Sequence, residues 1–196
     1  MKLYMGFEIN RILIEHCAPV LLRRKPAALF TLPSLQCLSC LKEAVSNALN
    51  IKVLRKSRSG ILIMVYDYAL LESLLLKNEN IRDSLALFGY GQYVSIDNYL
   101  SHLKNKLSEN SGFPHEIGLF LGYPPEDVFA FIRNKGQDYK YCGIWKVYEN
   151  EEYSRKCFDE YKHCRECLRR HLSSGGTVEN FKTAYKIKNI GGNVYE

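Results

Sequence analysis

One stretch decides the fold: Ile51-Lys-Val-Leu-Arg-Lys-Ser-Arg-Ser-Gly-Ile-Leu-Ile-Met-Val-Tyr66. Its first six residues largely alternate between apolar and polar side chains, which is typical of a half-buried strand. The next four are turn-forming residues that end in Gly60, and the last six are almost all apolar. We therefore predict an antiparallel β-hairpin whose second strand is covered on both faces.

Helical patterns lie on both sides of this hairpin in the sequence. Ser34 can cap a helix that runs to about Asn50, and Asp67 can cap a second one to about Lys77. An earlier helix over 7–17 would be closed or kinked by Pro19. Further helices are predicted over about 80–88, 95–109, 124–134 and 151–172, with a short one after Thr177, and strands over 139–148 and, unless it is a helical turn, 27–32.

This order of elements predicts an α+β fold, in which a small, mostly antiparallel sheet of about three to five strands is packed with several helices. The chain has 196 residues, a length that suits a single domain. We expect that domain to span residues 1–190 and residues 191–196 to form a loose C-terminal tail.

Composition narrows the class of protein. No apolar run reaches the ~20 residues that a membrane span needs, and the first residues contain no continuous apolar core of a signal peptide. We therefore expect a cytoplasmic protein. Seven cysteines, an odd number, favour reduced thiols over a disulfide framework. The net charge of +6 could attract an anionic ligand or nucleic acid, but no nucleic-acid-binding motif is present, so nucleic acid is the less favoured partner.

The candidate for function is Phe113-Pro-His-Glu-Ile-Gly-Leu-Phe-Leu-Gly-Tyr-Pro-Pro-Glu-Asp-Val128. Gly118 and Gly122 weaken a helix or a strand, so they indicate a close backbone approach or a demanding turn. His115 and Glu116 can carry protons or bind a metal. The segment therefore places polar chemistry inside an otherwise apolar stretch.

The blocks FPHEIGLFLGYP and GxWKVY, with His16-Cys17-Ala-Pro19, Lys25-Pro26 and 131–136, resemble an uncharacterised bacterial family of unknown function, found mainly in anaerobic Gram-positive bacteria. The resemblance covers nearly the whole chain. It implies a single cytosolic domain and no established activity. The family pattern falls on His16, Cys17, Pro19, Lys25, Pro26, Phe113, Pro114, His115, Glu116, Gly118, Gly122, Tyr123, Pro124, Asp127, Gly143, Trp145, Lys146 and Tyr148.

Four of these residues form the predicted catalytic set. A thiolate at Cys17 would be activated by a nearby imidazolium, and because adjacent helix residues diverge by about 100°, His115 is a better partner for it than His16. Glu116 could orient a histidine. The alternative is structural: Cys17 as a core residue, His16 as a helix-end histidine, and His115-Glu116 as a hydrogen-bonding hub.

A second set could bind a ligand. Along a strand, Lys146 and Tyr148 share one face and Trp145 lies on the other. With Lys25 and Tyr123, these residues could hold a phosphate, a carboxylate or the edge of a redox-active ring. The alternative reading is a lysine that snorkels beside a half-exposed tyrosine.

Two CxxC pairs, Cys37/Cys40 and Cys164/Cys167, could in principle bind zinc or an iron–sulfur cluster, but their separation is far longer than in compact metal modules.

The sequence supports three hypotheses for the function. The first is an enzyme with its site between the His16-Cys17 segment and the Phe113–Tyr123 motif; the second is a binding module for a metal, haem-like or redox ligand; the third is a basic adaptor for a partner or nucleic acid. The sequence specifies no cofactor and no oligomeric state.

Overall fold

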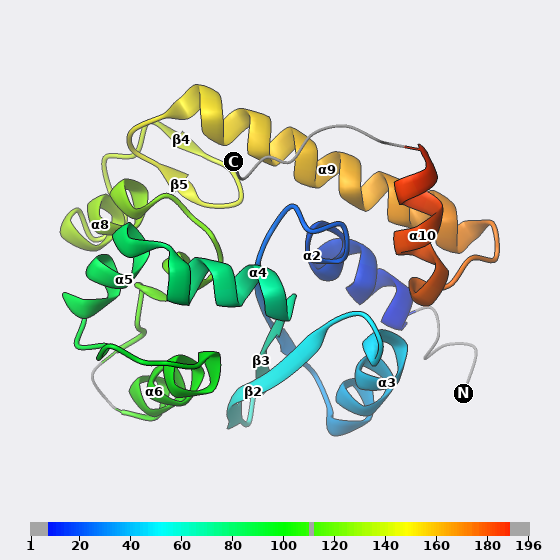
Figure 1. The fold of residues 1–196 in the computed structure, drawn as a ribbon, viewed down its shortest axis with the longest axis horizontal. Helices are drawn as coiled ribbons and strands as arrows, with labels where there is room; N and C mark the ends of the chain where they lie inside the picture. The colour runs from blue at the N-terminus through cyan, green and yellow to red at the C-terminus, as the bar shows by residue number, and fades with distance from the viewer. Residues whose placement is uncertain (1–7, 110–111, 189–196) are drawn as a thin grey trace.

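A computed structural model describes residues 8–109 and 112–188. Its centre is a three-stranded antiparallel sheet in the order β1 (Ala27–Leu32), β3 (Gly60–Tyr66) and β2 (Asn50–Ser57). Helices lie on both sides of this sheet, and the long helix α9 (Glu151–Ser173) runs along the top of the view in Figure 1. The predicted α+β class is confirmed, and the predicted tail at 191–196 lies outside the described residues.

The hairpin predicted from residues 51–66 is confirmed as β2 and β3, with Ser57 paired to Gly60 at the turn. β3 is the central strand and is buried along nearly its whole length. Alternate side chains of a strand point to opposite faces. Accordingly, Ile61, Ile63 and Val65 join one hydrophobic cluster, and Met64 and Tyr66 join a second.

The first cluster is built by the N-terminal helices. Residues 8–12 are helical, and the helix continues as a π-helical turn, η1 (Leu13–Cys17), and then as α2 (Ala18–Leu21). Of the two outcomes predicted at Pro19, closure or a kink, closure is wrong, because the helix continues to Leu21. A π-helical turn alters the hydrogen-bond pattern just before the proline, which lacks an N–H, so the helix can pass through it. α3 (Leu35–Val45), capped by Ser34 as predicted, and α9 cover the same cluster.

The second cluster lies on the other face of the sheet. It is covered by α4 (Tyr68–Glu72), η2 (Ser73–Lys77), α5 (Glu79–Ala86) and α6 (Ile96–Ser108). Asp67 caps α4 and Ser95 caps α6 through backbone N–H groups, as predicted. The candidate motif closes this side with α7 (Ile117–Phe120) and α8 (Pro125–Arg133), so it lies beside the sheet and not at a chain end.

A third, small cluster joins β4 (Tyr141–Cys142) and β5 (Lys146–Val147) to the start of α9. The single strand predicted over 139–148 is wrong, because a tight turn that includes Gly143 folds these residues into a two-stranded hairpin. A Cβ at position 143 would collide with the ring of Phe158 on α9. The last helix, α10 (Val178–Lys188), packs against α3 and α9. In the described part of the chain, no helix combines the length and apolar character needed to cross a membrane.

Candidate functional site

Two adjoining cavities lie where the three clusters meet. The first, of about 340 Å³, is enclosed by the Phe113–Val128 motif and the β4–β5 hairpin, and we refer to it as the apolar cavity. The second, of about 230 Å³, lies between η1, the start of β1 and α9, and we refer to it as the basic cavity. Four residues line both: Leu29, Leu121, Tyr123 and Ile144.

The two glycines of the motif shape the apolar cavity. A Cβ at Gly118 would lie 2.8 Å from Val128 Cγ2 and 3.2 Å from Tyr123 Cδ2, so only glycine lets α7 approach these side chains. Gly122 has a φ of 75°, which glycine adopts without strain. This turn directs Tyr123 onto Trp145, with 4.8 Å between the ring centroids. The predicted close approach and demanding turn are both present.

Asp127 holds the opposite wall of the cavity in place. It is buried, and its carboxylate accepts hydrogen bonds from Trp145 Nε1 at 2.8 Å, Tyr148 N at 2.7 Å and Glu149 N at 3.1 Å. A carboxylate with three donors is well compensated for its burial. Asp127 therefore fixes the β4–β5 hairpin on α8, a role that sequence reasoning did not assign.

The structure separates His115 from Glu116. His115 is exposed on the rim of the apolar cavity, with its ring centroid 4.9 Å from that of Phe131. Glu116 is buried on the other side, where Lys106 Nζ lies 2.6 Å from its Oε1 atom. Lys106 also donates to the carbonyl oxygen of Phe88. Glu116 therefore ties α7 to α6 and does not orient His115.

Lys146 and Tyr148 do not act as a pair. Lys146 lines the apolar cavity, but its Nζ donates to the carbonyl oxygen of Gly136 at 2.7 Å and lies 4.6 Å from the centre of the Tyr139 ring. Tyr148 is buried and lines neither cavity, and burial raises the pKa of its hydroxyl. Trp145 is thus the residue of this segment that both lines the apolar cavity and contacts Tyr123.

Lys25 is the central residue of the basic cavity. It follows α2, it is only 8% exposed, and its Nζ lies 5.1 Å from the centre of the Tyr123 ring and 5.9 Å from that of Tyr161. Within residues 8–109 and 112–188, no carboxylate pairs with it. Burial, reinforced by the positive charge of Arg165, lowers the pKa of Lys25 to about 8.

Two further basic residues line the same cavity. His16 is exposed and stacks on Phe30, with 4.3 Å between ring centroids, and its pKa is lowered, mainly by desolvation. Arg165 is half-buried on α9 and has no ion pair within the described ranges. Glu15 also lines the cavity, but it pairs with Arg169 at 3.3 Å. The cavity therefore gathers positive charge without a carboxylate committed to it.

Sequence reasoning missed Arg165 and Tyr161. Neither residue belongs to the family pattern or to the predicted catalytic and ligand-binding sets. Residues four apart on a helix lie on the same face, so Arg165 projects from the turn after Tyr161. That spacing was a usable signal, but nothing in the sequence shows that this face meets Lys25.

Cys17 does not reach either cavity. It is fully buried in the first hydrophobic cluster, and burial raises its thiol pKa to about 12. A thiol with that pKa is almost entirely protonated at neutral pH, so it is a poor nucleophile or metal ligand. The described residues contain no group of three or more His, Cys, Asp or Glu side chains that could hold a metal ion, and this includes both CxxC pairs.

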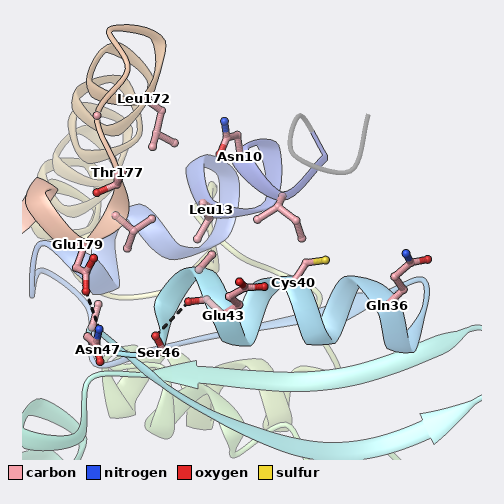
Figure 2. Close-up of a pocket in the computed structure, with 15 residues that line it drawn as sticks. Asn10, Leu13, Gln36, Cys40, Glu43, Ser46, Asn47, Leu172, Thr177 and Glu179 are labelled. Atoms are coloured by element: carbon pink, nitrogen blue, oxygen red, sulfur yellow. Dashed lines mark hydrogen bonds between the residues drawn. The ribbon is translucent and has the colours of Figure 1, made fainter. Parts of the chain in front are cut away.

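A larger cavity, of about 740 Å³, lies between α3, the end of α9 and the start of α10 (Figure 2). Among its described lining residues there is no lysine, arginine or histidine. One of its two carboxylates, Glu179, accepts a 2.6 Å hydrogen bond from Asn47. Although it is larger, this cavity is lined by none of the predicted site residues. The basic cavity, in contrast, is lined by His16, Lys25 and Arg165.

The fold and site define an α+β domain with two adjoining cavities, one with mainly apolar walls and one lined by His16, Lys25 and Arg165. The chain belongs to the family described as "Protein of unknown function (DUF3793)", whose family model matches residues 13–181. The resemblance to an uncharacterised family is thereby confirmed. No curated protein and no solved structure matches the chain.

Proposed function

We propose that this protein binds a small organic anion, with the charged group of the ligand in the basic cavity and its apolar body against Tyr123 and Trp145. The single observation that carries this function is Lys25: a buried lysine with no carboxylate partner within the described ranges, in a cavity that also contains Arg165. A bound anion would supply the missing counter-charge.

The energetic argument starts from desolvation. A buried charge is costly unless it is paired, and proteins retain such groups mainly where function needs them. The rings of Tyr123 and Tyr161 offset part of this cost through cation–π attraction. They do not provide a hydrogen-bond acceptor for the ammonium group. A carboxylate or phosphate in the cavity could accept hydrogen bonds from Lys25 and Arg165.

The apolar cavity favours a particular kind of anion. Its walls are mainly aliphatic and aromatic side chains, and it adjoins the basic cavity, with which it shares Tyr123 and three aliphatic residues. Binding sites for small molecules typically combine such apolar walls with a few placed polar groups. An aliphatic or aromatic carboxylate fits this arrangement better than a bare inorganic anion.

The site falls between the His16–Lys25 segment and the Phe113–Tyr123 motif, where sequence analysis placed a catalytic centre. In the present proposal Lys25 takes the central role in place of Cys17, with His16 as a nearby proton acceptor. His115 and Trp145 contribute to the apolar half, and Glu116, Lys146 and Tyr148 support the walls. A cytoplasmic location remains part of the proposal.

The two alternative functions have less support. A metal or haem-like module would need ligand side chains that the described residues do not gather. For a nucleic-acid adaptor, the basic residues of α9 would have to be free, but Arg155, Lys156, Arg169 and Arg170 pair with glutamates on the same helix. We therefore favour the small organic anion.

The test uses Trp145, the only tryptophan in the chain, as a fluorescent reporter at the wall of the apolar cavity. Wild-type protein is titrated with phenylacetate, hexanoate and inorganic phosphate. We expect saturable changes with the two organic acids and weaker binding of phosphate, which has no apolar body.

Lys25→Met and Lys162→Met form a matched pair of variants, since Lys162 is exposed on α9 next to Tyr161. Loss of a charged hydrogen bond should weaken phenylacetate binding by at least about tenfold in Lys25→Met. Lys162→Met should bind like the wild type. An unchanged Kd in Lys25→Met, or no saturable change with any acid, overturns the proposed function.

A further inference from the structure

Resting on the proposed function, we propose that the organic anion is a 2-oxo acid and that the Lys25 amine forms an imine with its carbonyl carbon. The carboxylate of the acid would face Arg165, and its side chain would extend into the apolar cavity. The argument rests on how the basic cavity combines a buried amine, a second cation and a proton acceptor.

The amine is suited to nucleophilic attack. Lys25 is buried, it has no carboxylate partner within the described residues, and it lies against two aromatic rings that cannot take its proton. A lysine in an apolar setting beside another cation is a recognised way to obtain a free amine. With a pKa of about 8, roughly a quarter of Lys25 is neutral at pH 7.5, against about a thousandth of an ordinary lysine.

The residues around Lys25 match the other needs of the reaction. Arg165 has no ion pair in the part of the chain that the structure describes, and its planar guanidinium can hold a carboxylate with two hydrogen bonds. His16 lines the same cavity, and its lowered pKa keeps the imidazole neutral at neutral pH, so it can accept a proton. A 2-oxo acid carries its carboxylate and carbonyl on adjacent carbons, which suits two neighbouring cations.

The proposed step is balanced without an oxidant or reductant. The Lys25 nitrogen lone pair forms a bond to the carbonyl carbon, and His16 takes one proton from the nitrogen and passes it to the former carbonyl oxygen, which becomes a hydroxyl. His16 then takes the second proton of the nitrogen and gives it to that hydroxyl, which leaves as water. The C–O bond breaks, a C=N bond forms, and the sum is amine plus ketone to imine plus water.

The test is reductive trapping with phenylpyruvate, which differs from phenylacetate in carrying a carbonyl next to the carboxylate. The wild-type protein is incubated with phenylpyruvate and sodium cyanoborohydride at pH 7.5, and the modified lysine is located by peptide mass spectrometry. We expect one adduct per chain, on Lys25, formed at least ten times faster than on any other lysine. Excess phenylacetate should suppress it by competing for the cavity.

Lys25→Arg is the informative variant, because it keeps a cation in the cavity but cannot form an imine. We expect it to lose the adduct, and its circular dichroism spectrum reports whether it folds. Adducts spread evenly over surface lysines, with phenylacetate still bound in the wild type, overturn the imine and leave the proposed function standing. Failure of phenylacetate and phenylpyruvate to bind at all overturns both.

Discussion

Asp127 lines the apolar cavity and Lys25 lines the basic cavity, and although both are buried, their surroundings are opposite. Asp127 is 2% exposed, and three N–H donors surround its carboxylate. Lys25 is 8% exposed, and its ammonium group lies near the faces of two tyrosine rings. One charge is fully compensated by the fold, and the other is compensated only in part.

The difference separates structure from function within one site. Compensated charges such as Asp127, or Glu116 with Lys106, fix the positions of the hairpin and the helices around the cavities. Lys25 makes no ion pair within the described residues. Its lowered pKa reports the free-energy cost of burying the ammonium group. Removing the two kinds of charge should therefore change stability in opposite directions.

The largest effect is expected for Asp127→Ala. Loss of the carboxylate leaves the N–H groups of Trp145, Tyr148 and Glu149 without an acceptor, two of them in buried residues. We expect the free energy of unfolding to fall by about 3–5 kcal/mol, measured by urea denaturation. Asp159→Ala, at an exposed position on α9, is the control and should have little effect. Equal losses in the two variants would contradict a structural role for Asp127.

The second effect has the opposite sign. Lys25→Met keeps the volume of the side chain and removes the buried charge, so at pH 7 we expect stability to rise by about 2–3 kcal/mol. Lys162→Met, on the surface, should be close to neutral. A Lys25→Met variant less stable than the wild type would show that Lys25 is held by the fold as firmly as Asp127 is.

The cost of burying the Lys25 ammonium group should also appear as a pH dependence of the free energy of unfolding. The pKa of Lys25 is about 8 in the folded chain and about 10.5 when unfolded, so the folded state loses its proton first as pH rises. Stability should therefore increase between pH 8 and about 10.5 in the wild type relative to Lys25→Met. Below pH 8 the difference between the two should be constant. The groups that face Lys25, namely Glu15, His16, Tyr123, Tyr161 and Arg165, are identical in both proteins.

Local patterns were enough to predict most of the fold. The hairpin 51–66 and the caps at Ser34, Asp67 and Ser95 each depend on a few neighbouring residues, and all are present. The errors arose where tertiary contacts decide. The hairpin at 141–147 is held by Asp127, which lies on the preceding helix, α8. The helix through Pro19 depends on a π-helical turn that no sequence pattern indicates.

The candidate site was predictable by region but not by role. The sequence singled out Lys25, Tyr123 and His115 because the family pattern includes polar positions. All three line the apolar cavity or the basic cavity. The pairing of Cys17 with His115 requires an exposed thiol, and burial is a property of the packed fold that the sequence does not show. Glu116 and Lys146 were given functional roles, but Lys106 and the Gly136 carbonyl engage them instead.

The smallest effect is expected for His115→Ala, which changes the apolar cavity and not the basic cavity. His115 is exposed on the rim of the apolar cavity and contacts Phe131, so its removal should change the free energy of unfolding by less than about 0.5 kcal/mol. Binding of phenylacetate, followed by Trp145 fluorescence, should weaken by roughly two- to threefold through lost apolar contact. His163→Ala, exposed on α9 outside both cavities, is the control.

The ratio between the effects of His115→Ala and Lys25→Met on binding is the decisive quantity. If the cationic end recognises the ligand, the Lys25 variant loses at least several times more affinity than the His115 variant. If His115→Ala abolishes binding and Lys25→Met does not, recognition lies at the rim of the apolar cavity, and the unpaired lysine is tolerated for another reason. One variant changes the apolar cavity and the other changes the basic cavity, so a single titration series on each assigns the binding energy to one of the two cavities.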